Sequence, residues 1–188
     1  MKRVIACLLI LFLCGCTIVR IDTNSLDTII NVVLKKQNKM FNRVGKGYKY
    51  YVPKGVQYVD TNDLNEVLYS NEYYYYLYID AVSYYNDIKP NYKVDEDAYY
   101  SRIISKEDGF TSSGYINITK KGDLYLINFE YNYAKIEALV KKEDINDTVL
   151  NSAYILSTVK FNYDIIDLML DEEYFTSHEE KYNVLGEN

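Results

Sequence analysis

The segment from Tyr115 to Val140 restricts the possible folds more than any other part of the chain. It contains three runs of strand-forming residues that are separated by short polar turns: Tyr115–Thr119, Leu124–Tyr131 and Ala134–Val140. Strands joined by such short turns pair in antiparallel order, because a parallel pair needs a long crossover connection. The middle run alternates two sets of side chains, and the aromatic set is expected to face the core: Tyr125, Ile127, Phe129 and Tyr131. The sequence therefore predicts an antiparallel meander.

In the N-terminal part of the chain, before the meander, apolar residues have the spacing of a helix. Asn24 and Asp27 are placed as an N-cap and a first-turn acid. Apolar residues then fall near one helix face: Leu26, Ile29, Ile30, Val33 and Phe41. This pattern predicts a helix that begins at Asn24 and ends before the glycines Gly45 and Gly47.

Helical periodicity returns after Lys142. Apolar residues at i, i+4, i+8 and i+11 form one stripe that is expected to lie on the sheet: Ile145, Val149, Ala153 and Leu156. A second amphipathic run begins at Asn162 and contains Ile165, Ile166, Met169 and Leu170. Further on, Ser177–Glu180 matches a capping box, which predicts a last short helix through Leu185.

The segments between the first helix and the meander have strand chemistry. Tyr48–Val52 and Val56–Val59 read as a tight hairpin around the turn residues Pro53–Gly55. The next segment, Thr61–Ser70, is expected to be a short helical or irregular connection.

The tyrosine-rich run Tyr73–Tyr85 is the strongest strand candidate of the chain, and its middle is expected to be a central strand. A loop over Asn86–Asp97 carries Pro90, and Tyr99–Ile104 predicts a further strand.

Antiparallel strands with helices at the two ends of the chain predict an α+β fold, in which a mainly antiparallel sheet is packed by N-terminal and C-terminal helices. The series of a Tyr51–Gly55 hairpin, a meander ending in Ala134–Val140 and a helix closing on Ile155–Val159 resembles the PsbP-like α/β/α domains. The resemblance covers Tyr48–Phe161 and transfers no functional residue. It implies a small sandwich, often found on exported or lipid-anchored proteins, that mostly binds partners and does not catalyse.

The start of the chain has the features of an export signal. Lys2 and Arg3 precede an apolar run from Val4 to Leu13. A membrane-spanning helix needs about 20 apolar residues, and this run provides roughly half of them. A cleaved signal peptide is therefore expected rather than a transmembrane anchor.

The signal ends in Leu13-Cys14-Gly15-Cys16, which resembles the lipobox of bacterial lipoproteins. This resemblance implies cleavage between Gly15 and Cys16, with acyl chains such as palmitate on Cys16. Two or three acyl chains hold a protein stably on a membrane. Cys14 is a poorer lipidation residue because Leu13, which is not small, precedes it. An ordinary secretory signal is the alternative, although no A-x-A-like cleavage site lies nearby.

These features divide the chain into a signal peptide (1–15), a lipidated N-terminus with a short tether (16–23) and a single α+β domain (24–188). They predict a location on the extracytoplasmic face of the cell membrane. Cys7 and Cys14 leave with the signal and Cys16 carries lipid, so the mature chain is expected to have no free thiol, disulfide or cysteine zinc site.

The mature chain is acidic. Loss of Lys2 and Arg3 leaves 19 basic residues against 27 acidic ones, a net charge of about −8. Nucleic acid and anionic lipid attract clustered basic residues, and here these are scattered. We therefore expect no nucleic-acid binding and attachment to the membrane through the lipid on Cys16.

The sequence lacks the residues that common enzyme sites need. His178 is the only histidine, and it lies beside a predicted helix cap near the C-terminus. We therefore expect neither a Ser-His-Asp triad nor a multi-histidine metal site within one chain. No glycine-rich nucleotide loop or Gly-x-Ser-x-Gly motif occurs. We expect a protein that is not an enzyme and that has no cofactor and no metal.

Acidic runs leave two alternatives to this expectation. An acid pair of a hydrolase could come from Asp95–Asp97, Asp171–Glu173 or Glu179–Glu180, although sequence neighbours rarely have that geometry. Asp60–Glu66 spaces oxygen ligands as a calcium loop does, but it lacks the glycine and the final acid of an EF-hand. A turn or helix cap is the preferred interpretation of that segment.

Tyrosine is the remaining feature, with 23 residues in the chain. In the run Tyr73–Tyr78, a strand would place Tyr74, Tyr76 and Tyr78 on one face and Tyr73 and Tyr75 on the other. The first set is a candidate binding surface, because tyrosine combines apolar area with a hydroxyl. Strand propensity together with the codon bias of an AT-rich genome is the alternative explanation.

The function expected from the sequence is that of a non-catalytic, lipid-anchored envelope protein that interacts with an envelope protein as an accessory module. A glycan-binding or small-ligand-binding lipoprotein that uses the tyrosine-rich surface is the second hypothesis, and an acid-pair hydrolase is the third.

Overall fold

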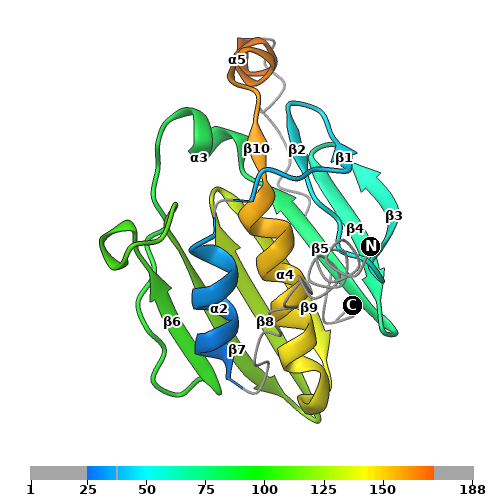
Figure 1. Cartoon of the computed structure of the whole chain (residues 1–188), viewed down its shortest axis with the longest axis vertical. Helices are drawn as coiled ribbons and strands as arrows, with labels where there is room; N and C mark the ends of the chain where they lie inside the picture. Colours follow the sequence, from blue (N-terminus) through cyan, green and yellow to red (C-terminus); the bar gives the residue numbers. More distant parts are fainter. Residues whose placement is uncertain (1–24, 37, 172–188) are drawn as a thin grey trace, which may run out of the picture.

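The computed structural model describes residues 25–36 and 38–171 (Figure 1). The α-helices are α2 (Leu26–Leu34), α3 (Ala81–Tyr85), α4 (Ile145–Thr158) and α5 (Tyr163–Asp171). The strands are β1 (Arg43–Val44), β2 (Tyr48–Tyr50), β3 (Gln57–Asn62), β4 (Asn65–Ser70), β5 (Tyr73–Ile79), β6 (Tyr100–Ile104), β7 (Gly114–Lys121), β8 (Leu124–Tyr131), β9 (Ala134–Val140) and β10 (Lys160–Phe161).

The strands form two sheets. The larger sheet has seven strands in the order β3-β4-β5-β9-β8-β7-β6, and the smaller sheet has three in the order β1-β2-β10. All neighbouring strands are antiparallel. Helices α2 and α4 lie side by side across one face of the larger sheet, as Figure 1 shows. These features confirm the predicted α+β fold with an antiparallel sheet packed by helices. The PsbP-like resemblance stays a prediction.

The meander is present as predicted in β7, β8 and β9. Asn132 and Tyr133 join β8 to β9 with φ angles of 56° and 59°, which is the left-handed backbone of a tight hairpin turn. The aromatic set of β8 is buried, as expected: Tyr125, Ile127, Phe129 and Tyr131. The apolar stripe of α4 is also buried and packs on β8 and β9: Ile145, Val149, Ala153 and Leu156.

Helix α2 is shorter than the sequence suggested. It ends at Leu34, and Phe41, which was expected on its buried face, is 49% exposed. Lys35, Lys36 and Gln37 follow Leu34 in the sequence and offer nothing apolar to the core. Because most helical stability in a protein comes from packing of an apolar face, the helix stops there. The expected cap Asn24 lies outside the described residues.

The predicted hairpin around Pro53–Gly55 is wrong. β2 pairs with β1 and β10 in the smaller sheet, whereas β3 pairs with β4 in the larger one. A turn does form, since the Val56 amide donates to the Pro53 carbonyl at 3.1 Å. The chain nevertheless leaves β2 toward α4, where the Tyr51 amide donates to Thr158 Oγ1 at 3.0 Å.

The predicted irregular connection Thr61–Ser70 is also wrong, because β4 occupies most of it. The inward positions of this strand are Glu66, Leu68 and Ser70, all of which are buried. Two of these three residues are polar, so the strand lacks the apolar alternation by which a buried face is recognised.

The tyrosine-rich run is a strand only in its first half. β5 ends at Ile79, and it lies within the larger sheet between β4 and β9 as expected. Asp80 then caps α3, because its carboxylate accepts a hydrogen bond from the Ser83 amide at 2.8 Å. The predicted strand β6 and the amphipathic helix α5 are confirmed.

Candidate functional site

The larger sheet has an outer face, defined by the side chains that point away from α2 and α4. On β5, Tyr75 points inward and its hydroxyl approaches Thr148 of α4 to 3.5 Å. Side chains alternate along a strand, so the neighbouring even positions point outward. On the five central strands the half-buried or exposed outer-face residues are Asn65, Val67, Tyr69, Tyr74, Tyr76, Tyr78, Tyr115, Asn117, Thr119, Lys121, Leu124, Leu126, Asn128, Glu130, Lys135, Glu137 and Leu139.

The three tyrosines singled out in the sequence, Tyr74, Tyr76 and Tyr78, all lie on this outer face. Tyr74 is 49% exposed, whereas the inward Tyr75 is 1% exposed. The structure therefore places them together at the surface of the sheet, although they take part in two different groups of residues.

Tyr74 and Tyr76 belong to an aromatic patch, which we define as Val67, Tyr69, Tyr74, Tyr76, Leu126 and Leu139. The rings of Tyr69 and Tyr74 are 5.1 Å apart and those of Tyr74 and Tyr76 are 6.4 Å apart. Val67 is paired with Tyr76, and Leu139 with Leu126 on the neighbouring strand. The patch therefore runs continuously across β4, β5, β9 and β8.

Tyr78 belongs to a second group, the acidic site, which we define as Tyr78, Tyr115, Glu130, Lys135 and Glu137. Tyr78 donates from its hydroxyl to Glu137 Oε2 at 3.2 Å. Lys135 Nζ lies 2.9 Å from Glu137 Oε1 and 4.6 Å from the centroid of the Tyr78 ring. The ammonium group is thus held by a carboxylate and a ring face together.

Glu130 and Tyr115 form the other half of the acidic site. In the sheet register Lys135 is opposite Glu130, and Glu130 is opposite Tyr115. Burial raises the pKa of Glu130, and the negative charge of Asp80 raises it further, against the opposing effect of Lys135. Burial and repulsion from Glu130 raise the pKa of Tyr115 to about 12.

The loop before β6 lies against this end of the outer face. The ring of Tyr92 stacks on that of Tyr115 with centroids 4.0 Å apart and planes at 4°. The Tyr92 hydroxyl is 2.8 Å from Ser101 Oγ, which also accepts a hydrogen bond from the Asp95 amide at 2.9 Å. These contacts hold the Tyr92 ring in place beside the acidic site.

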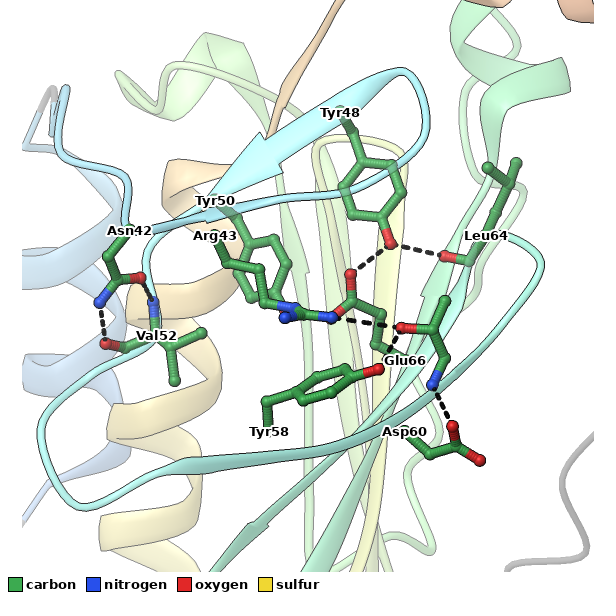
Figure 2. Close-up of polar contacts among 10 residues, drawn as sticks. Asn42, Arg43, Tyr48, Tyr50, Val52, Tyr58, Asp60, Leu64 and Glu66 are labelled. Atoms are coloured by element: carbon green, nitrogen blue, oxygen red, sulfur yellow. Dashed lines mark hydrogen bonds and ion pairs between the residues drawn. The ribbon is translucent and has the colours of Figure 1, made fainter.

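A separate polar network centres on Glu66 and joins the two sheets (Figure 2). Glu66 is fully buried on β4. From β2, the Tyr48 hydroxyl donates to Glu66 Oε1 and the Tyr50 hydroxyl to Glu66 Oε2, both at 2.6 Å. From β1, Arg43 donates through Nε to Glu66 Oε2. The carboxylate is therefore surrounded by three donors.

The Glu66 network shifts the protonation of its members. Burial, followed by the hydrogen bond to Glu66, raises the pKa of Tyr48 and of Tyr50 well above their usual range. Burial lowers the pKa of Arg43, but the hydrogen bond and charge of Glu66 outweigh it, and the pKa is raised. The Arg43 guanidinium carbon also lies 3.3 Å from the centroid of the Tyr58 ring. Because Glu66 has no exposed surface, this network is structural.

A groove of about 780 Å³ opens where the N-termini of α2 and α4 approach β6, with the lining Leu26, Asp27, Tyr99, Tyr100, Lys142, Glu143, Ile145 and Asn146. The Asp27 carboxylate accepts hydrogen bonds at 2.8 Å from the Tyr100 hydroxyl and from Arg102 Nη1. Burial and the Asp27 bond raise the pKa of Tyr100 to about 12. Asp27 and Tyr100, two polar residues of the lining, therefore bind each other.

Two of the acidic segments of the sequence lie wholly within the part of the chain that the structure describes, and they lie on different elements. Asp95–Asp97 lies on the loop before β6, and the calcium-like segment Asp60–Glu66 is the β3–β4 hairpin with Asp63 in its turn (φ 52°). Within residues 25–36 and 38–171, no group of three or more His, Cys, Asp or Glu side chains is arranged to hold a metal ion. Among these same residues, no helix is long and apolar enough to cross a membrane.

Several predicted features lie outside the described residues: Gly15, Cys16, His178, Glu172–Glu173, Glu179–Glu180 and the capping box Ser177–Glu180.

The sequence analysis did not identify Glu130, Glu137 and Glu66 as site residues. The first two stand at outward positions of strands that were predicted, so their shared face could have been noticed, whereas Glu66 lies in a strand that was not predicted.

Searches against models of protein families, curated proteins and solved structures each found no match to this chain.

Proposed function

We propose that the chain is a lipid-anchored, non-catalytic protein on the extracytoplasmic face of the cell membrane, and that it binds another envelope protein through the aromatic patch. The observation that carries the proposal is the patch itself. Aromatic and aliphatic side chains from four adjacent strands lie next to one another on a face that neither α2 nor α4 covers.

The chemistry of the patch suits a protein partner. Tyr69, Tyr74 and Tyr76 combine large apolar rings with hydroxyl groups, a composition that is enriched in protein interfaces and at their hot spots. The rings contact one another, so less side-chain freedom remains to be lost on binding. The strands beneath them belong to the meander and its neighbours, which gives the patch a rigid support.

The lipobox supports the proposed location. Cys16 would attach the chain to the membrane, and the segment 17–24 would connect it to α2. This segment of eight residues spans roughly 25 Å when fully extended. A partner of the patch is therefore expected among proteins that lie close to the same membrane surface.

Position-specific photo-crosslinking in native cells tests the proposal. A benzoyl-phenylalanine in place of Tyr74 should form one dominant protein adduct, and the same residue in place of Val44, which is 68% exposed on β1, should not form it. Tyr76→Ala should lower the adduct yield at least five-fold. The matched variant Tyr99→Ala removes an exposed tyrosine from the other side of the sheet and should leave the yield unchanged.

The other outcomes have distinct meanings. Equal adducts at positions 74 and 44, or none at position 74, would contradict binding through the patch. An adduct to saccharide alone would favour the glycan-binding alternative. A yield that falls equally in Tyr76→Ala and Tyr99→Ala would indicate a loss of folding rather than of a contact.

A further inference from the structure

The acidic site contains more negative than positive charge. Glu130 and Glu137 flank one ammonium group, that of Lys135, and Asp80 contributes a further negative charge to the surroundings of Glu130. Partial burial weakens the screening of these charges by water. The Coulomb attraction of a cation to this site is therefore stronger than its attraction to an exposed carboxylate.

Lys135 shows how the site holds a cation. Its ammonium group lies between the Glu137 carboxylate at 2.9 Å and the Tyr78 ring at 4.6 Å. The same two kinds of group recur across the next strand pair, where Glu130 is opposite Tyr115 and the Tyr115 ring is stacked on Tyr92. Glu130, which is hydrogen-bonded to the Tyr115 side chain, thus offers a second cation a carboxylate beside two aromatic side chains, those of Tyr115 and Tyr92.

The acidic site adjoins the aromatic patch. Glu137 is directly paired with Tyr76, a member of the patch. One step along the same outer face, two residues or about 7 Å on each strand, leads to the row of Tyr78, Lys135, Glu130 and Tyr115. A ligand with an apolar side chain on the patch would place its next side chains over the acidic site.

We propose that the acidic site binds a lysine or arginine side chain of the protein partner, at Glu130 beside the Tyr115 and Tyr92 rings, while an aliphatic side chain of the same segment sits on the aromatic patch. This inference rests on the proposed function and specifies the chemistry of the partner. The charge of the site and the cation it already holds favour a basic partner over an acidic or a neutral one.

A titration with defined peptides tests the inference. The probes are Ac-Leu-Ala-Lys-amide and Ac-Leu-Ala-Gln-amide, added to the full lipidated chain in lipid nanodiscs, with the tyrosine ring resonances followed by NMR. The lysine peptide should bind with a Kd at least five-fold lower than the glutamine peptide and should shift the Tyr115 resonance. Glu130→Gln should remove this difference, since glutamine keeps the shape and loses the charge.

The control is Glu143→Gln, which removes an exposed charge on the side of α2 and α4 and should keep the five-fold preference. Equal binding of both peptides to the unaltered chain, or a preference that survives Glu130→Gln, would overturn the inference. The inference would also be overturned if N-acetylglucosamine oligomers displaced the lysine peptide and so reversed its shift of the Tyr115 resonance. The Tyr74 adduct in cells depends on none of these results, so the inference and the proposed function fail separately.

Discussion

At the scale of single residues, Glu66 shows what a buried carboxylate requires. A charge removed from water is costly, and the cost is offset only where donors surround it. Tyr48, Tyr50 and Arg43 supply these donors from the smaller sheet. The free-energy cost of burying the Glu66 charge is therefore offset only when the smaller sheet packs on the larger one. An arrangement of the two sheets that leaves Glu66 without these donors would be less stable.

Replacement of Glu66 by glutamine should therefore destabilise the protein. Glu66→Gln removes the charge that Arg43 pairs with and turns one acceptor into a donor that faces a tyrosine hydroxyl. Breaking a buried pair in this way costs about 3 kcal/mol, and the free energy of unfolding measured with urea should fall by roughly that amount. Glu143→Gln, at an exposed position, should change it by less than about 0.5 kcal/mol. Equal effects of the two variants would refute a structural role for the network.

The raised pKa values of the buried tyrosines lead us to expect a loss of stability at alkaline pH. The pKa values of Tyr48 and Tyr50 are raised by burial and by Glu66, and those of Tyr115 and Tyr100 are raised to about 12. In the unfolded chain tyrosine loses its proton near pH 10, so above this pH the unfolded state binds fewer protons than the folded one. Stability should hold below about pH 10 and fall as the pH rises further.

Absorbance of tyrosinate at 295 nm and circular dichroism, recorded together, check this dependence. Ionisation of the buried tyrosines should coincide with unfolding. Tyr50→Phe removes one group with a raised pKa, so its stability should fall less steeply between pH 10 and pH 12 than that of the unaltered chain, although it is less stable at pH 7. A steeper fall would show that the sign of the linkage is wrong.

At the scale of elements, the sequence predicted those parts in which one physical pattern dominates. The meander and α4 were recognised because apolar residues repeat with a period of two or of about 3.6. The same alternation placed Tyr74, Tyr76 and Tyr78 on one face of β5. β4 was missed because its buried face carries Glu66 and Ser70, and α3 because the tyrosines of its sequence favour a strand.

The Glu66 network and the acidic site form only when the strands pair in one particular register, and local sequence patterns do not show that register. The Glu66 network joins residues 43, 48 and 50 to residue 66 across two sheets, and the acidic site requires β5, β9, β8 and β7 to pair in one alignment. These pairings are fixed by the turns and by the packing of the whole core. The aromatic patch, in contrast, could be located in part because its densest residues follow one another along a single strand.

The close pairing of β7 and β8 depends on Gly114. A Cβ atom at this position would lie 2.0 Å from the Glu130 carbonyl oxygen, which belongs to the neighbouring strand and cannot move freely. Gly114→Ala should lower the free energy of unfolding by about 2–3 kcal/mol, as overpacking does. Gly122→Ala is the control, because its Cβ would meet nothing and only the left-handed backbone (φ 61°) would cost about 1 kcal/mol. Equal losses in thermal unfolding would contradict this role of Gly114.

At the scale of the whole molecule, the two faces of the larger sheet differ in how deeply their side chains are buried. The inner face carries the core with α2 and α4, so substitutions there change stability. The outer face carries the aromatic patch and the acidic site, whose half-buried side chains can change with a smaller effect on folding. This division allows variants of Tyr76 or Glu130 to be read as tests of binding, provided that their unfolding transitions are measured alongside.

The proposed anchoring concerns the whole molecule, because it would separate this chain from a secreted binding protein, and it would depend on Cys16. Cys16→Ala should abolish incorporation of an alkyne-tagged palmitate and block lipoprotein-specific processing, because no thiol remains at the position that the lipobox resemblance assigns to the diacylglycerol. Cys14→Ala is the matched control and should keep full labelling, since Gly15 and Cys16 are intact. Among the described residues the core begins in α2, so the Cys16→Ala variant should unfold at the same urea concentration as the unaltered protein. Equal labelling of both variants, or loss of labelling in Cys14→Ala alone, would refute lipidation at Cys16 and leave a conventional secretory signal as the explanation of the apolar start.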